Sequence, residues 1–178
     1  LANEMYLDSA DLRSSVVSLA KQVGYTPTSS TSSTATIDVL VSPASGASLT
    51  MSRGTKFTTT VDGQSYSFVN NADVSITPVS GVYQFNNLSI HEGSYLNYKY
   101  TANTSDIDQR FIIPNDSVDT ATLTVKVQES SSNAITNTYK LATGITSIDS
   151  TSKVYFLQEV EGGRFEVYFG DGVTGKAI

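Results

Sequence analysis

The sequence predicts a mainly β fold, with antiparallel sheets in two lobes and one amphipathic helix at the N-terminus. From residue 35 onward, nearly every segment alternates apolar and polar residues at the strand period of two. Turn residues separate these segments, and Asp62-Gly63 is the strongest hairpin signal. Only residues 8–24 show the three- and four-residue apolar spacing that is typical of a helix.

The predicted helix comes first along the chain. Asp8 and Ser9 can cap its N-terminus, and Gly24 can end it in the left-handed conformation. Arg13 and Lys21 fall on its polar side, where we expect solvated surface charges. Its apolar stripe can either pack on the β-structure of the same chain or form a seam for a partner subunit. This candidate interface consists of Leu12, Val16, Leu19 and Val23.

A polar segment follows the helix. Residues 27–34 contain only one proline, serines and threonines, so we expect a linker or extended arm that lets the helix sit away from the sheets. A second polar break at Ser130-Ser131-Ser132-Asn133 separates two β regions. The predicted parts are an N-terminal helix and Ser/Thr-rich arm (1–34), an antiparallel β domain (35–129), and a second β lobe with the closing hairpin (130–178).

About ten to twelve strands are expected. The segments with strand character are residues 37–41, 57–61, 65–69, 74–77, 82–90, 95–100, 111–113, 121–127, 136–141 and a closing hairpin within 153–169. In that hairpin, Gly162-Gly163 supplies backbone freedom where the chain reverses. The chain starts without Met and stops soon after a glycine-rich turn, which suggests an internal fragment of a longer protein.

The glycine-rich loop at residues 170–176 has two interpretations. Gly170, Gly175 and Lys176 stand at the spacing of a phosphate-binding loop. Such a loop next needs a hydroxyl for Mg²⁺, and Ala177 occupies that position. A structural turn is therefore favoured, in which Gly170, Gly172 and Gly175 serve positions of positive φ or close backbone approach.

Composition limits the function classes. The 178 residues can bury a core without a staple, and the absence of cysteine excludes disulfides and thiol chemistry. A net charge of −6 argues against nucleic acid as a partner, because phosphate binding relies on clustered Lys and Arg. No apolar run is long enough to span a bilayer, so we expect a soluble chain with no membrane partner.

The residues show no catalytic constellation and predict neither a cofactor nor a metal site. His91 is the only histidine, and a lone histidine is more often a turn or surface residue than a base or ligand. Asp106 and Asp108 lack the glycine and glutamate of a calcium loop. Tyr98 and Tyr100 are expected to share a strand face, with Tyr95 nearby, and to pack in a core rather than stack on a sugar.

A series of short motifs recurs in one known family in the same order and spacing. The motifs are Tyr6-Leu7-Asp8, residues 12–21, Gly24-Tyr25-Thr26-Pro27, Gly54-Thr55-Lys56-Phe57, Asp62-Gly63, Glu92-Gly93, residues 109–114, residues 123–127, Tyr155-Phe156 and Phe169-Gly170-Asp171-Gly172. In this respect the chain resembles the baseplate J-like wedge proteins of contractile-tailed bacteriophages, almost from end to end.

The resemblance implies a non-enzymatic structural subunit of the virion tail baseplate, assembled in the host cytoplasm. It implies association with itself, as a homodimer or ring, and with other baseplate wedge proteins to form the inner baseplate ring, without a small-molecule substrate. Family analogy places partner contacts on the helix stripe and on the closing hairpin. The alternatives are a carbohydrate-binding or adhesin-type β module, which the absence of Trp weakens, and a nucleotide-binding enzyme, which depends on the incomplete loop alone.

Overall fold

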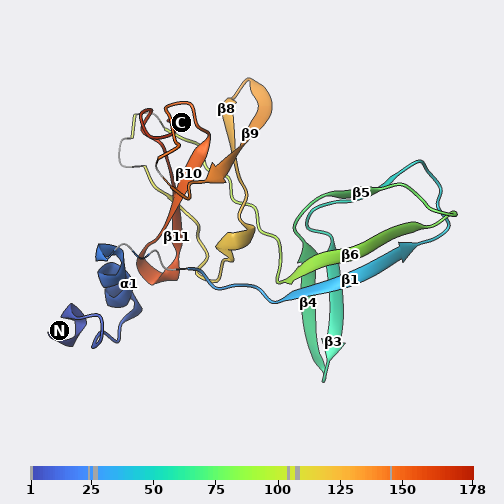
Figure 1. The fold of residues 1–178 in the computed structure, drawn as a ribbon, viewed down its shortest axis with the longest axis horizontal. Helices are drawn as coiled ribbons and strands as arrows, with labels where there is room; N and C mark the ends of the chain where they lie inside the picture. Colours follow the sequence, from blue (N-terminus) through green and yellow to red (C-terminus); the bar gives the residue numbers. More distant parts are fainter. Residues whose placement is uncertain (1, 24, 26–27, 104, 107–108, 145) are drawn as a thin grey trace. The chain divides into compact units, whose positions relative to one another are not determined.

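The computed structural model describes residues 2–23, 25, 28–103, 105–106, 109–144 and 146–178. Within them the chain forms eleven strands, one α-helix and three short 3-10 helices (Figure 1). The helices are η1 (Ala2–Met5), α1 (Arg13–Gln22), η2 (Thr120–Thr122) and η3 (Glu161–Gly163). None of these helices is long and apolar enough to cross a membrane. The predicted mainly β fold with one N-terminal α-helix is confirmed.

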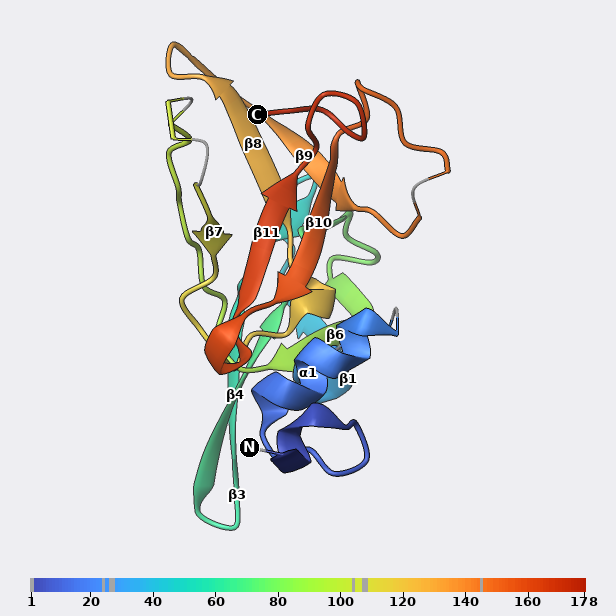
Figure 2. The ribbon, with the colours of Figure 1, turned by 90° about the vertical axis from the view of Figure 1, so that its left-hand side faces the viewer.

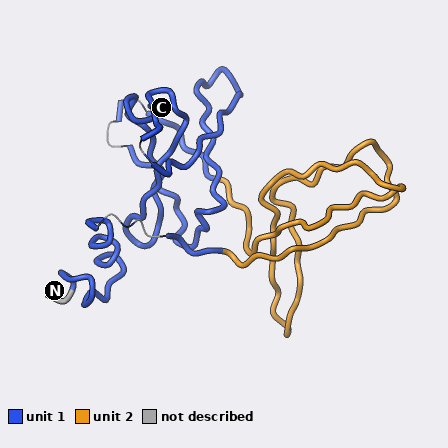
Figure 3. Tube along the Cα trace, viewed as in Figure 1, with its two compact units in different colours: residues 1–31, 98–178 blue, residues 32–97 orange. Residues whose placement is uncertain are grey.

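The strands fall into two compact units, which are coloured separately in Figure 3. Unit 1 combines residues 1–31 and 98–178, and unit 2 consists of residues 32–97. The strands of unit 2 are β1 (Thr34–Val41), β2 (Leu49–Met51), β3 (Lys56–Val61), β4 (Gln64–Asn70), β5 (Val74–Ile76) and β6 (Tyr83–Glu92). Those of unit 1 are β7 (Phe111–Ile112), β8 (Val125–Ser130), β9 (Asn133–Leu141), β10 (Val154–Glu159) and β11 (Phe165–Phe169).

Unit 2 is a four-stranded antiparallel sheet in the order β1-β6-β4-β3, beside a two-stranded sheet of β2 and β5. Its buried side chains come mainly from the inner strands and include Val69, Tyr83, Phe85, Leu88 and Ile90. The Tyr83 hydroxyl donates to the carbonyl of Gly46 at 2.7 Å and accepts from its amide at 2.8 Å. These two bonds fix the loop that leads from β1 to β2.

The β3–β4 hairpin forms as the sequence predicts. Asp62 and Gly63 connect the strands with φ angles of 50° and 80°, and Val61 pairs with Gln64 across them. Two successive positive φ angles are the mark of the type I′ turn, whose twist suits a two-residue hairpin. The tip of this hairpin projects beyond β1 and β6 (Figure 1).

Unit 1 is a five-stranded sheet in the order β7-β11-β10-β9-β8 (Figure 2). All its pairs are antiparallel except β9 with β10, a parallel pair that the sequence did not predict. Its core consists of Ile113, Tyr139, Tyr155, Phe165 and Val167. The Phe169 ring at the end of β11 meets Phe111 and Tyr139 edge-on, with centroid distances of 5.7 and 5.5 Å. Such edge-to-face packing joins three strands at one point.

Two predicted strands differ from the structure. Residues 94–100 form no strand, and Tyr100 instead packs edge-on against Phe111 at 5.9 Å while its hydroxyl donates to the Ile112 carbonyl. Strand β8 begins at Val125 rather than near residue 121, because the Asp119 carboxylate accepts from the Ala121 amide and caps η2. The structure also contains the short strand β2, which no prediction covered.

The two compact units do not have the boundaries of the three parts predicted from the sequence. The boundary at residues 129 and 130 falls inside β8, whose partner β9 belongs to the same sheet. The helix and most of the polar arm belong to unit 1, so the helix does not sit away from the sheets. Ser29 in the arm holds Thr120 by two hydrogen bonds of 2.8 and 2.9 Å. Pro27 lies outside the described residues.

Candidate functional site

The predicted interface stripe runs the length of α1 but does not have a uniform environment. Leu12 and Val23 are the capping residues at the two ends, and they are 59% and 74% exposed. Val16 and Leu19 are half-buried, and Ala20 is the buried residue of the helix. The ends of the stripe are therefore open to a partner, whereas its middle is partly covered by the chain itself.

Further exposed apolar side chains flank the helix, and the interface predicted from the sequence did not contain them. Met5 and Tyr6 precede it and are 69% and 67% exposed, and Tyr25 follows it. Together with the ends of the stripe they form what we call the N-terminal apolar surface: Met5, Tyr6, Leu7, Leu12, Val23 and Tyr25. Met5, Tyr6, Leu7 and Tyr25 lie outside the helical repeat, so a search for periodicity alone cannot find them.

The start of α1 differs from the prediction. Asp8 and Ser9 do not cap it; the helix begins after Leu12, whose side chain offers no cap. The Glu4 carboxylate accepts from the amides of Asp11 and Leu12 at 3.2 and 3.3 Å. Hydrogen bonding, first of all from Ser15, lowers the pKa of Glu4. A carboxylate from η1 thus supplies the negative charge that a helix N-terminus favours. Gly24, the predicted end, lies outside the described residues.

Arg13 and Lys21 were predicted to be solvated surface charges, and both are exposed, but each also bonds to Glu159, which the prediction did not include. The Arg13 guanidinium donates to both carboxylate oxygens of Glu159, at 2.8 and 2.9 Å. The Lys21 ammonium donates to the backbone carbonyl of the same Glu159. Glu159 ends β10 and is only 2% exposed, and its carboxylate is the largest cause of the raised pKa of Arg13. The two basic residues of α1 therefore both bind to one buried position of the closing hairpin.

A second arginine pairs with the next strand of the same hairpin. Arg110 donates to the two carboxylate oxygens of Glu166 on β11 at 2.8 and 2.7 Å, and Gln158 on β10 donates to Glu166 at 2.8 Å. These donors, Arg110 first, lower the pKa of the buried Glu166. Bidentate arginine–carboxylate pairs are directional as well as strong, so Arg110 fixes the chain just before β7.

The glycine loop after β11 is closely packed. A Cβ on Gly170 would lie 2.2 Å from the backbone carbon of Gly175, so only glycine fits there. Gly172 and Gly175 have φ angles of 86° and 89°. Gly170 is therefore required because the backbone of Gly175 lies so close to it, whereas Gly172 adopts a positive φ that L-residues avoid.

The backbone amides of this loop are used inside the protein. Those of Gly172 and Gly175 donate to the carbonyls of Gly175 and Asp149, and the Lys176 amide donates to Ser152. The amides of residues 173 and 174 donate to the Asp171 carboxylate at 2.9 and 2.8 Å. A phosphate would have to displace all of these bonds, and the Lys176 side chain is paired with Glu129. The loop thus acts as a turn that ties β11 to neighbouring segments.

Asp149 anchors the other side of the loop. Its carboxylate accepts from the Ser152 hydroxyl at 2.8 Å and from the amide and hydroxyl of Thr151 at 2.9 Å. These bonds, with Ser152 the largest contributor, lower the pKa of Asp149 to about 2. Because its backbone carbonyl receives the Gly175 amide, the order of this turn fixes the position of the glycine loop.

His91 bridges two loops in unit 2. The Asn71 side-chain amide lies 3.1 Å from its Nε2 atom, and the Ser32 hydroxyl lies 3.3 Å from Nδ1. Neither neighbour is an acid, so these two contacts provide no carboxylate to orient the imidazole. Among the described residues, no group of three or more histidine, aspartate or glutamate side chains is arranged to hold a metal ion; Asp108 lies outside them.

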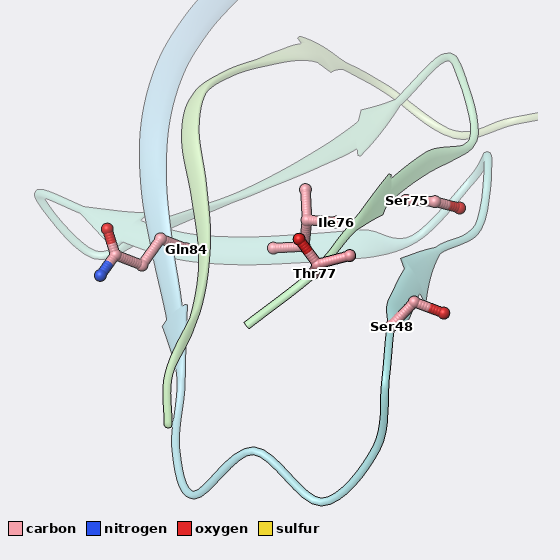
Figure 4. Close-up of a pocket in the computed structure, with 5 residues that line it drawn as sticks. All are labelled: Ser48, Ser75, Ile76, Thr77 and Gln84. Carbon is pink, nitrogen blue, oxygen red and sulfur yellow. The ribbon is translucent and has the colours of Figure 1, made fainter. Parts of the chain in front are cut away.

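Unit 2 also has an open hollow of about 410 Å³ (Figure 4). It is lined by Ser48, Ser75, Ile76, Thr77 and Gln84. Sugar-binding sites commonly use an aromatic face for stacking, and these lining residues provide none. Tyr95 is not among the residues that line this hollow; the Arg53 guanidinium lies 4.4 Å from its ring centroid. The hollow has hydroxyl and amide groups but no charged side chain to direct chemistry.

Comparison with known proteins relates this geometry to a family. Residues 97–178 match the family model of the bacteriophage baseplate wedge protein gp6, third domain. That segment begins where the chain enters unit 1 for the second time, so it contains the whole five-stranded sheet. Over 173 residues, 95% of its length, the chain is 30% identical to the baseplate wedge protein gp6 of Enterobacteria phage T4. It spans 25% of the length of that relative. The predicted resemblance is confirmed: over almost its whole length the chain is similar to a baseplate wedge protein of a bacteriophage.

Proposed function

We propose that the chain is a structural part of a phage tail baseplate wedge, which self-associates and binds neighbouring wedge proteins in the inner baseplate ring. The observation that carries this proposal is similarity to a baseplate wedge protein across both compact units. A non-enzymatic role is consistent with the way the polar groups are used. The loop amides, the buried glutamates and Lys176 all make bonds within the fold.

The N-terminal apolar surface is the proposed contact with a partner. Protein interfaces are enriched in aromatic residues and methionine and depleted in acids at their centre. Met5, Tyr6 and Tyr25 fit this composition, and all three are at least 60% exposed. Leu12 and Val23 extend the same character along α1. Burying these side chains against a neighbour would remove apolar area from water, which favours association.

The test replaces the most exposed aliphatic residues of this surface. The triple variant Met5→Ser, Leu12→Ser, Val23→Ser leaves the half-buried Val16 and Leu19 unchanged, so the helix keeps its contacts with its own unit. We expect the variant to lose self-association in light-scattering measurements and to recover less of the other wedge proteins in pull-down. Circular dichroism should show an unchanged β-rich spectrum.

A matched control changes exposed aliphatic residues in unit 2. Leu40 and Val61 are 66% and 52% exposed, so Leu40→Ser with Val61→Ser removes two exposed aliphatic side chains from the other unit. We expect this variant to associate normally. The proposed interface would be refuted if the control lost association and the N-terminal variant kept it, or if both variants assembled like the unchanged chain.

A further inference from the structure

The docking of α1 depends on polar contacts to one residue. Arg13 and Lys21, in the first and last turns of the helix, bind respectively the carboxylate and the backbone carbonyl of Glu159. The 3-10 helix η3 lies against α1; it forms the turn between β10 and β11 and begins two residues after Glu159 (Figures 1 and 2). Both basic residues of the helix thus meet the same end of the closing hairpin.

Apolar burial contributes only part of this docking, since Val16 and Leu19 are no more than half-buried. Ala20 is the buried residue of α1, and an alanine side chain offers little area to remove from water. The large apolar residues at the two ends, Leu12 and Val23, are exposed. A helix of ten residues is too short to be stable in water by itself. The bonds to Glu159 therefore add to these apolar contacts in keeping α1 folded and in place.

The two partners of the Arg13–Glu159 ion pair differ strongly in exposure. Its side chain is 2% exposed, so loss of Arg13 would leave a buried carboxylate without its counter-charge, which is costly. The Arg13 side chain, by contrast, is 63% exposed and lines an open hollow of about 500 Å³. Asp116 lines the same hollow. Ions and competing side chains can therefore reach Arg13 without any opening of the sheet.

We propose that Glu159 acts as a latch: it holds α1 against the closing hairpin, and α1 can be released from it as a unit while the five-stranded sheet stays folded. Released α1 would lose its helical structure unless another surface covered its apolar side chains. The latch goes beyond the proposed function, since it concerns this chain alone and needs no particular partner. It makes Arg13, Lys21 and Glu159 positioning residues for the N-terminal apolar surface.

Hydrogen exchange of the 178-residue chain tests the latch. Glu159→Gln removes the charge and sets an amide group against Arg13, while Arg13→Ala and Lys21→Ala remove the anchors from the helix side. We expect the amides of residues 13–22 to exchange about tenfold faster or more in Glu159→Gln and Arg13→Ala. The amides of β10 and β11 should keep their protection. Arg13→Lys should restore part of the helix protection, because it keeps the charge but not the two-pronged geometry.

Glu166→Gln is the matched control. It breaks the other arginine–glutamate pair of the same hairpin, so it should leave the amides of residues 13–22 as slow as in the unchanged chain. Unchanged helix protection in both Glu159→Gln and Arg13→Ala would overturn the proposal. Equal loss of protection in α1, β10 and β11 would also overturn it, because α1 would then unfold only with the sheet. If Glu159→Gln does not fold, Arg13→Ala and Lys21→Ala are judged in the same way. Unchanged protection of α1 in both, or an equal loss in α1, β10 and β11, overturns the proposal.

Discussion

The β10–β11 and β3–β4 hairpins have similar sequence signals but different places in their sheets. β10 and β11 lie inside a five-stranded sheet, between β9 and β7, and most of their residues are buried or half-buried. β3 is an edge strand, and residues 58–66 of its hairpin are all exposed. The alternating pattern and the glycine turn predict a hairpin, but the neighbouring strands decide how much of it is buried. Substitutions should therefore cost far more in the closing hairpin.

The largest expected effect is that of Gly170→Ala, just after β11. The added Cβ would lie within 2.5 Å of three backbone atoms of Gly175, so the loop or β11 must move. We expect the free energy of unfolding to fall by on the order of 3 kcal/mol or more. Thermal and urea unfolding followed by circular dichroism measure it. A loss below about 1 kcal/mol would show that the loop rearranges easily and is not a fixed part of the fold.

Glu166→Gln should have the next largest effect. The new amide group places a donor against the Arg110 guanidinium in a buried position, and we expect a loss of about 2 kcal/mol at neutral pH. Arg110 itself is half-exposed, so its charge stays solvated, which keeps the loss below that of a fully buried pair. Chemical unfolding at pH 7 measures this difference.

The same variant gives a pH test with a defined sign. The pKa of Glu166 is lowered from 4.5, chiefly by Arg110, so its charged form stabilises the folded state above that pH. This contribution is lost as the pH falls through the lowered pKa. The stability difference between the unchanged chain and Glu166→Gln should therefore be constant above about pH 5 and shrink below pH 4.5. A difference that grows on acidification would contradict this assignment.

Gly172→Ala, in the loop after β11, and Gly63→Ala, in the turn of the β3–β4 hairpin, compare two loops at nearly equal φ. Their φ angles are 86° and 80°, and neither added Cβ would meet an atom closer than 3.9 Å. The cost is then conformational alone, about 1–2 kcal/mol at both positions despite their different surroundings. Paired melting curves test the equality. Markedly different losses at the two sites would mean that packing, and not φ, determines the cost.

The smallest effect is expected at the exposed tip of the β3–β4 hairpin. Tyr66 and Val61 are 36% and 52% exposed, and threonine has a comparable preference for strands. Val61→Thr and Tyr66→Thr should each change the free energy of unfolding by about 0.5 kcal/mol or less. A loss above 1.5 kcal/mol, measured by the same unfolding experiments, would show that the tip is packed against other residues in solution.

Part of the fold could be predicted because the signals are local. Asp62-Gly63 specifies its hairpin through the φ angles of two residues, and the register of β3 and β4 follows from that turn. Alternation likewise located most other strands. It failed at residues 95–100, where the pattern resembles a strand but the Tyr100 side chain bonds to the backbone of β7 instead. The side-chain pattern alone carries no information on whether a neighbouring strand is available for pairing.

The sequence by itself determined the mainly β class, the N-terminal helix, the glycine-rich turn after β11 and the resemblance to baseplate wedge proteins. Each of these is encoded by residues close together or by ordered short motifs. Only the tertiary structure decided how α1 is held. Arg13 and Glu159 are 146 residues apart, and Lys21 reaches the same residue across 138. A charge on a helix face is usually solvated, and its partner becomes visible only when the chain has folded. The pairing of Lys176 with Glu129, 47 residues away, depends on the fold for the same reason.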